Sequence, residues 1–347
     1  MAARGAEKAT GPWRVTFVTN PDDCNLACDM CPGHSPLGPG PRRPPRRLDP
    51  ELVLAVLAER EGSPLREVVP STMGEPLLWA GLDRLAAACQ ARGLSLNVTT
   101  NGTFPGRGPR AWARLLAPAT RDLKVSWNGA SAAVAERLMG GLRYEAALDA
   151  LRAFLVERDA VAAAGGRRCR VSFQVTAQEE NLAELPEVVR LAARLGVERV
   201  KLHHLQPRLP HLRARCLGRD GGAAARWNGA VRACLRAAGE AELPGGGRVL
   251  LENATELPPG GAAAAPRGPC PFLGQEAWVL ADGRFAPCPH PAAAEGELGE
   301  FGDLRRTALA EIWTGQALAG LRAGFLEHPV CRSCSFRRAG GASEIAP

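Results

Sequence analysis

The repeated alternation of predicted strands and helices constrains the fold of this chain more than any other sequence feature. The predicted strands are short runs rich in β-branched and apolar residues, at residues 14–19, 66–70, 94–100, 122–127, 169–177 and 198–204. Helical segments are predicted between and after them, including residues 80–92, 183–195 and 223–238. This order favours parallel βαβ units with right-handed crossovers, and six such units can curve into a partial barrel. The sequence therefore predicts an α/β fold with functional residues after the C-terminal ends of its strands.

The composition is that of a globular protein with one large and one small domain. The chain has 347 residues, and 46% of them are hydrophobic, which is enough for a sizeable core. No run of 18 apolar residues predicts a transmembrane helix, and the first 23 residues carry charges without a central apolar stretch. We therefore expect a cytoplasmic protein with no membrane association.

Positive charge predominates along the chain, with 43 Lys and Arg residues against 36 Asp and Glu residues. Aromatic residues make up only 5% of the chain and include a single tyrosine, so a stacking surface for nucleic acid is not expected. The densest basic run, at residues 42–47, is either a solvated loop or a contact for an anionic substrate or partner.

Eleven cysteines fall into two clusters and a scattered remainder. In a reducing compartment clustered cysteines indicate a metal site or catalysis rather than disulfides. Single cysteines among apolar neighbours are usually small core residues, and this is the expectation for Cys89, Cys169, Cys216 and Cys234.

The first cluster, Cys24-x3-Cys28-x2-Cys31, lies in a polar loop directly after the first predicted strand. Three thiolates can bind three irons of a four-iron cube and leave the fourth iron open to a ligand. A zinc site is the alternative, but structural zinc normally takes four ligands, and His34 is the only nearby candidate for the fourth.

The amino-acid composition changes after about residue 240, where Gly/Ala/Pro-rich loops separate short predicted strands. Asp282-Gly283 predicts a hairpin turn between two of these strands, and a helix is predicted near residues 306–323. Such a small unit has little core of its own, so a bound metal would help to stabilise it. We therefore predict two domains, at residues 1–240 and 241–347.

The second cluster is spread over this C-terminal unit. Cys270-x17-Cys288-x42-Cys331-x2-Cys334 supplies four thiolates, two near the predicted hairpin and a close pair after the helix. Four thiolates suit either an iron–sulfur cluster or a closed structural zinc site. His290, two residues after Cys288, is an alternative ligand or an outer-sphere neighbour.

The first cysteine cluster, with apolar Met30 before its third cysteine, resembles that of the radical S-adenosylmethionine (SAM) superfamily. The resemblance implies a partial barrel of the radical SAM type and a 4Fe-4S cluster whose open iron binds SAM. It also implies an external electron donor, such as flavodoxin or ferredoxin, and reductive cleavage of SAM to a 5′-deoxyadenosyl radical. That radical would take a hydrogen atom from the substrate.

Later motifs are similar to those of the same superfamily and occur in the expected order at strand ends. A Gly-Glu pair would hold the methionine amino group, a Thr-Asn-Gly segment would face the ribose, and the backbone before the third cysteine would meet the adenine. A Val-Ser-x-Asn segment has Asn128 where the family usually has Asp. The implied cofactor-binding residues are Met30, Gly74, Glu75, Asn101, Ser126 and Gln174. Some of the polar ones could instead be turn formers.

The second cluster is similar to the opening of the SPASM domain, without the cysteines that complete the full domain. The resemblance implies the shortened twitch form, which holds one auxiliary 4Fe-4S cluster able to accept an electron from the substrate. An oxidoreductase-type reaction follows, either a dehydrogenation or a cross-link of a small-molecule or peptide substrate. The early first strand slightly favours a small molecule, or a peptide presented by a separate protein.

Two questions stay open from the sequence. His203 and His204 end the sixth predicted strand and are candidate proton donors or acceptors, although they could simply cap the strand. The competing function is a non-catalytic electron carrier or scaffold that binds iron–sulfur clusters or zinc. Glu75 and an open-coordination cysteine triplet argue against that alternative, because a carrier needs neither.

Overall fold

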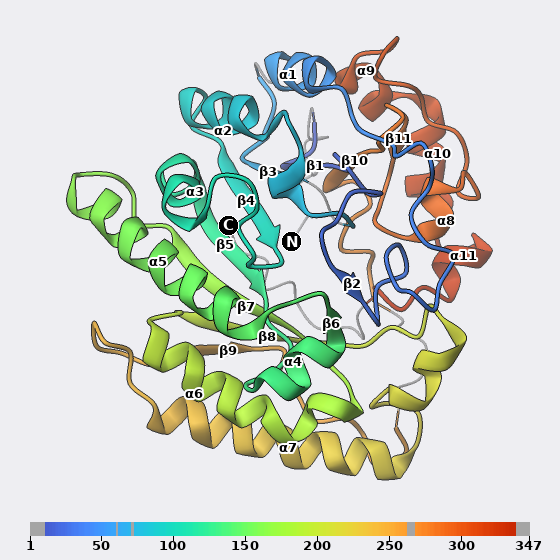
Figure 1. Cartoon of the computed structure of the whole chain (residues 1–347). Helices are drawn as coiled ribbons and strands as arrows, with labels where there is room; N and C mark the ends of the chain where they lie inside the picture. Colours follow the sequence, from blue (N-terminus) through green and yellow to red (C-terminus); the bar gives the residue numbers. More distant parts are fainter. Residues whose placement is uncertain (1–10, 60–61, 71–72, 262–267, 338–347) are drawn as a thin grey trace, which may run out of the picture.

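The computed structural model describes residues 11–59, 62–70, 73–261 and 268–337. A curved sheet forms its centre, and helices cover the outer side of the sheet (Figure 1). The first ten residues, on which part of the expectation about a secretory signal rests, lie outside the described residues, as do residues 262–267 of a predicted Gly/Ala/Pro-rich loop.

The described strands of this sheet run in the order β11-β10-β1-β3-β4-β5-β7-β8-β9. Their bounds are β1 Arg14–Phe17, β3 Glu67–Pro70, β4 Ser95–Thr100, β5 Thr120–Ser126, β7 Arg170–Ala177, β8 Arg199–His204, β9 Leu250–Glu252, β10 Glu276–Val279 and β11 Phe285–Ala286. Neighbours from β10 to β9 are parallel, and β11 is antiparallel to β10. The predicted α/β class and partial barrel are confirmed.

Helices alternate with the strands along the chain. Their bounds are α1 Pro50–Ala58, α2 Leu82–Ala91, α3 Pro109–Leu116, α4 Ala132–Leu138, α5 Tyr144–Ala163, α6 Leu185–Leu195 and α7 Gly221–Glu240. α1 begins after Asp49, whose side chain caps the helix by accepting a hydrogen bond from the backbone N–H of Glu51 at 2.9 Å. The sequence pattern does not predict α3, which at 8 residues is too short to show a clear period, although it buries Trp112 and Leu116.

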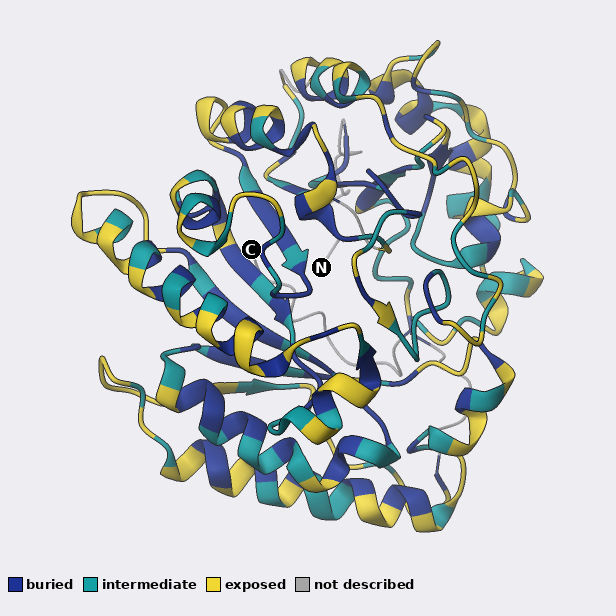
Figure 2. Cartoon of the chain, viewed as in Figure 1, coloured by how far each residue is buried: buried dark blue, intermediate teal, exposed yellow. Residues whose placement is uncertain are grey.

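Alternate residues of the barrel strands face opposite sides of the sheet. One set is apolar and packs beneath the helices, and it includes Val15, Phe17, Val98, Leu123, Val125, Phe173, Val175 and Val200. The other set faces the inside of the barrel, the lumen, and is polar on most strands. The two-residue period of a strand produces this separation. The main core therefore lies between sheet and helices, dark blue in Figure 2, and the lumen is left for polar groups.

The C-terminal part joins the barrel more closely than the sequence predicts. β9, expected in the small unit after residue 240, pairs instead with β8, with Leu251 opposite Val200. β10 pairs with β1, and the predicted hairpin is present, because Gly283 donates to Leu280 in the turn before β11. Both units thus contribute strands to one sheet, and the division into two domains at residue 240 stays a prediction.

Short helices follow the hairpin and gather with it, orange to red in Figure 1. Their bounds are α8 Pro291–Ala294, α9 Leu309–Thr314, α10 Gln316–Gly324 and α11 Pro329–Arg332. The single helix predicted near residues 306–323 is wrong, because the extended backbone of Gly315 separates α9 from α10. In the described part of the chain, no helix combines the length and apolarity needed to cross a membrane.

Candidate functional site

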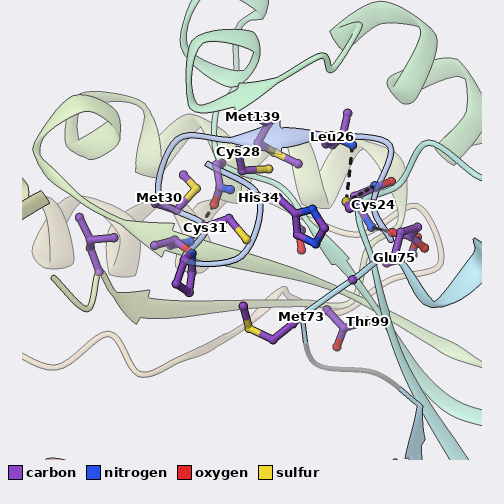
Figure 3. A pocket seen from close by; sticks show the side chains of 18 of the residues that line it. Cys24, Leu26, Cys28, Met30, Cys31, His34, Met73, Glu75, Thr99 and Met139 are labelled. Carbon is purple, nitrogen blue, oxygen red and sulfur yellow. Dashed lines mark hydrogen bonds between the residues drawn. The ribbon is translucent and has the colours of Figure 1, made fainter. Parts of the chain in front are cut away.

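A cavity of about 480 Å³ opens at the C-terminal ends of the barrel strands, beneath the loop that carries the first cysteine cluster (Figure 3). Loop residues form one wall and polar residues from the strand ends form the other. The strand-end residues are Glu75, Thr99, Thr100, Asn101, Ser126, Asn128 and Thr176. The position of this cavity agrees with the expectation that function lies at the C-terminal ends of the strands.

A second, two-stranded sheet anchors the cysteine loop to the barrel. β2 (Ala27–Cys28) pairs antiparallel with β6 (Met139–Gly140), and the backbone N–H of Asp29 donates to Leu138 at 3.1 Å. The Asp29 carboxylate also accepts a hydrogen bond from Arg215, and it lies 3.2 Å from Nε2 of His211. Sequence reasoning missed both contacts, because strands of two residues and partners far along the chain leave no local pattern.

All three cysteines of the first cluster line the cavity, and their side chains lie along the loop in Figure 3. Burial, together with the neighbouring Cys31 and Cys24, raises the pKa of Cys28 to about 12. Burial also raises the pKa values of Cys24 and Cys31. Thiols of this kind stay protonated at neutral pH unless a bound cation stabilises the thiolates.

The three thiols of the cysteine loop suit a four-iron cube, because each thiolate binds a different iron and the fourth iron stays open. Among the described residues, no group of three or more His, Cys, Asp or Glu side chains is arranged for a single metal ion. His34, the alternative zinc ligand, directs Nε2 at the carbonyl oxygen of Pro21 at 2.9 Å, so that nitrogen carries the proton.

Glu75 is the buried acid of the cavity, with 2% of its surface exposed. Its carboxylate accepts hydrogen bonds from the backbone N–H of Leu77 at 3.1 Å, the hydroxyl of Thr100 at 2.8 Å and the backbone N–H of Asn101 at 2.7 Å. Burial raises the pKa of Glu75 to about 7 despite these bonds. No described residue forms an ion pair with Glu75, which lines the cavity.

The residue before Glu75 is Gly74, and a side chain would not fit at that position. A Cβ atom at Gly74 would lie 1.9 Å from the carbonyl oxygen of Asn20, so only glycine fits against the loop. The backbone N–H of Glu75 donates to Asp23 at 2.8 Å, and the Asn20 side chain donates to the carbonyl of Glu75 at 2.8 Å. These bonds hold the Gly-Glu segment against the start of the cysteine loop.

The other expected cofactor contacts differ in their surroundings. Asn101 lines the cavity, donates to the side chain of Asn25 at 2.8 Å and lies 3.9 Å from the sulfur of Cys24. Met30 and Ser126 also line the cavity. Gln174 does not line it, although it is the register partner of Ser126, and its Oε1 is 2.6 Å from Nε2 of His203.

Asn128, which stands where the family usually has Asp, joins two strand ends. Its side-chain oxygen accepts a hydrogen bond from the backbone N–H of Thr176 at 2.8 Å, and its carbonyl accepts one from Asn181 at 3.0 Å. A neutral amide serves as well as a carboxylate in this position, because Thr176 needs only a side-chain acceptor and Asn181 donates to the backbone carbonyl of Asn128.

The two candidate histidines lie on opposite faces of β8. His203 is on the lumen face, and His204 lines the cavity with its ring edge-on to Trp227 at 4.5 Å between centroids. Burial lowers the pKa of both, that of His203 to about 4 with a further contribution from Lys201 and Lys124. Both imidazoles are therefore neutral at pH 7, and a catalytic role for either stays a prediction.

The second cysteine cluster surrounds a small apolar cavity. Cys270, Cys288, Cys331 and Cys334 line it together with Phe272, Leu298, Phe325, Val330 and Phe336. Burial raises the pKa of Cys288 to about 12, and the three other thiols add to the effect. These residues can hold a four-iron cube in a water-poor pocket. The alternative ligand His290 uses Nδ1 to accept a hydrogen bond from Ala292 at the start of α8.

Three of the four scattered cysteines are core residues as the sequence predicts, whereas Cys216 is only partly buried. Cys89, Cys169 and Cys234 are fully buried in the main core, and Cys216 packs beside a small apolar group near Met30. In the basic run at residues 42–47, Arg46 and Arg47 pair with the carboxylates of Asp22 and Asp23, just before the first cysteine.

Two family models match the chain. The model of the radical SAM superfamily matches residues 21–192, and that of an iron–sulfur cluster-binding domain, SPASM, matches residues 270–335. The two matched segments contain the two cysteine clusters and almost all the polar residues of the cavity.

Curated relatives are distant in sequence. The chain is 28% identical over 195 residues to the mycofactocin maturase MftC of Mycolicibacterium smegmatis, covering 56% of this chain and 44% of the relative. It is 27% identical over 265 residues to a PqqA peptide cyclase of Xanthomonas campestris pv. campestris, covering 76% of this chain and 65% of the relative. Less than two thirds of the length of either relative is therefore matched.

Solved structures share the fold. SuiB of Streptococcus suis, bound to S-adenosylmethionine, superposes with a TM-score of 0.65 at 14% identity, over 96% of this chain and 73% of that chain. A SuiB structure with its precursor peptide SuiA gives a TM-score of 0.64 at 16% identity, over 96% and 72% of the two chains. The protein anSMEcpe with bound AdoMet gives 0.63 at 15% identity, over 94% and 87%.

Proposed function

Because this chain belongs to the radical SAM superfamily and ends in a SPASM-type iron–sulfur domain, we propose that it oxidises or cross-links a peptide. The superfamily uses a 4Fe-4S cluster and SAM, and the C-terminal domain carries auxiliary iron–sulfur chemistry. The names of the relatives favour a peptide over a small molecule, since one is a peptide cyclase and a structural neighbour binds a precursor peptide. An external donor such as flavodoxin or ferredoxin would supply the electron.

Different residues around the cavity would bind the cluster and SAM. Cys24, Cys28 and Cys31 hold the SAM-binding cube, and the buried carboxylate of Glu75 binds the methionine ammonium. When bound, the cluster and SAM supply the 5′-deoxyadenosyl radical that takes a hydrogen atom from the substrate. Met30, Gly74, Asn101 and Ser126 position the rest of SAM around the cavity.

The observation that carries this proposal is the unpaired carboxylate of Glu75 beside the three-cysteine loop. A carboxylate can accept about four hydrogen bonds, and three are already made to neutral donors. Its raised pKa reflects a buried charge without a counter-ion. An ammonium group would supply both the missing charge and the fourth donor.

Replacing Glu75 by glutamine is expected to weaken SAM binding by about 10- to 100-fold, the usual worth of a hydrogen bond to a charged group. Glutamine keeps the shape but cannot neutralise an ammonium. Equilibrium dialysis of the reconstituted protein with SAM measures the effect. Exposed Glu300→Gln is the matched control, and iron content shows that the loop keeps its cluster. Equal affinity in the Glu75 variant and the parent would remove this residue from the site.

The same binding should depend on pH in the parent. The pKa of Glu75 is raised to about 7, so below that value the carboxyl is protonated and must lose its proton before it can bind an ammonium. SAM affinity should therefore fall by up to about tenfold for each pH unit below 7. The Glu75→Gln protein should show no such slope between pH 5.5 and pH 7, because it has no proton to lose there.

Anaerobic reconstitution is expected to load about eight irons per chain, from two clusters of the four-iron type. The two cysteine groups use separate ligands, so each loads its own cube. Metal analysis that found about four irons with one zinc would favour structural zinc at the second group. If the fully loaded, reduced protein formed no 5′-deoxyadenosine from SAM, a non-catalytic carrier would replace the proposed enzyme.

A further inference from the structure

The lumen of the barrel beneath the cavity contains many charged side chains. They lie on the strand positions that face inward, in the same pleat as the cavity-lining residues of β4, β5 and β7. The basic ones are Arg14, Lys124, Arg170, Arg199 and Lys201, and the acidic ones are Glu67, Asp122, Glu252 and Glu276. Five cations therefore face four anions.

Every acidic side chain of the lumen already has a basic partner. The ion pairs are Arg14 with Glu67 and Glu276, Arg199 with Asp122 and Glu252, Arg170 with Asp122, and Lys201 with Glu252. Lys124 makes no hydrogen bond or ion pair with any described residue. Its ammonium is the lumen cation that no carboxylate of the described residues contacts, and Glu67 and Glu252 act on it only from beyond ion-pair distance.

Lys124 lies directly below the floor of the cavity. It is the register partner of Thr99 on β4 and precedes Ser126 by two residues on β5, and both of those residues line the cavity. Gln174, the register partner of Ser126, provides a second donor there. Its Oε1 faces His203, whereas its buried amide nitrogen has no partner among the described residues.

The choice of lysine is not explained by composition. The chain has three lysines among its 43 basic residues, and both described ones, Lys124 and Lys201, face the lumen. Arginine is thus the usual cation of this protein, and the lumen holds three arginines beside the two lysines, whose compact ammonium binds as a point charge. Desolvation lowers the pKa of Lys124 to about 8, and the neighbouring cations Arg14 and Lys201 add to this effect, which Glu67 and Glu252 oppose.

We propose that Lys124, with the amide of Gln174, binds a carboxylate of the substrate in the lumen beside the cavity. Both groups are donors and one is charged, so a carboxylate satisfies both, whereas a cationic or purely apolar group would leave them unpaired. The substrate is thus an acidic peptide segment, which presents either an Asp or Glu side chain or its own C-terminus. This inference rests on the proposed function, because it takes the lumen as the place where substrate binds.

Lysine-selective NMR tests the contact directly. With ¹³C at Cε of lysine, the chain gives only three lysine signals, and Lys124→Arg removes and thereby assigns one. Acetyl-glutamate amide and N-acetylalanine are added to the reconstituted protein with SAM at constant ionic strength. Acetyl-glutamine amide and acetylalanine amide are the uncharged controls. The Lys124 signal should shift with a carboxylate probe and not with its amide.

The two carboxylate probes separate the two sources of the charge, since one carries a side-chain carboxylate and the other a terminal one. The carboxylate probe that shifts the Lys124 signal more is then titrated by calorimetry. Its affinity should be at least tenfold lower for Lys124→Met than for the parent, and Lys124→Arg should retain most of the affinity. A Lys124 signal that ignores all probes, or that responds equally to acid and amide, overturns the inference. The NMR shift is measured on the parent protein, so it tests the inference even if Lys124→Met does not fold. Formation of 5′-deoxyadenosine by the parent without probes is measured separately, and its failure would count against the proposed function instead.

Discussion

A Cys28→Ala protein is expected to lose reductive cleavage of SAM completely. Three thiolates are the minimum that holds a four-iron cube with one open iron, and the loop has no fourth cysteine to replace a missing one. Cys28 is also the most constrained of the three, because it lies in β2 and is paired with Met139 of β6. Chromatography with UV detection of 5′-deoxyadenosine, after reduction in the presence of SAM, measures the loss.

The control for this experiment is Cys89→Ala. Cys89 is fully buried in α2, on the side of the sheet away from the cavity, so its loss removes a small core side chain and no ligand. That variant should keep both clusters and normal SAM cleavage, at a cost of about 1 kcal/mol in stability. Formation of 5′-deoxyadenosine by Cys28→Ala near the parent rate would contradict the ligand assignment of the loop.

Cys334→Ala is expected to separate SAM cleavage from product formation. It removes one of the four thiolates around the apolar C-terminal cavity and leaves the first cysteine loop intact. If the auxiliary cluster accepts the electron left after hydrogen abstraction, the variant should still form 5′-deoxyadenosine but yield little oxidised peptide. Cluster potentials span roughly −700 to +450 mV with charge, hydrogen bonding and exposure, so a buried cube can accept that electron.

Loss of the metal could also unfold the small unit and disturb the substrate site. Circular dichroism and SAM affinity of Cys334→Ala therefore accompany the product assay. A folded variant without the second cluster that formed oxidised product at the parent rate would assign this cluster a structural role only.

Much of the barrel was predictable because its strands have a simple local signature. Runs of β-branched residues such as Val15 to Phe17 predict buried strands, and the motifs fall at the strand ends in order. The cysteine spacing and the Gly-Glu pair were likewise visible in the sequence, since close backbone approach and thiolate ligation each require one residue type.

Pairing between distant segments was not predictable from local patterns. The contact of β10 with β1 joins residues more than 250 apart, and nothing near Glu276 indicates it. The same holds for Asp29 and Arg215, which meet only when the loop folds over the barrel. Lys124 has no ion-pair partner because the lumen carboxylates pair with other basic side chains. The register of the strands across the whole sheet determines those pairs, and no local pattern shows it.

The hydrogen bonds between β1 and β10 couple the stability of the two cysteine sites. β1 leads directly into the first cysteine loop, and Val18, the residue after β1, still donates to Val279 at 2.8 Å. Any free energy that a metal adds to the C-terminal unit is therefore shared with the strand that supports the other cluster. Binding of one cluster should therefore lower the free energy needed to order the empty site of the other. The backbone pairing of β1 with β10 would carry this positive cooperativity.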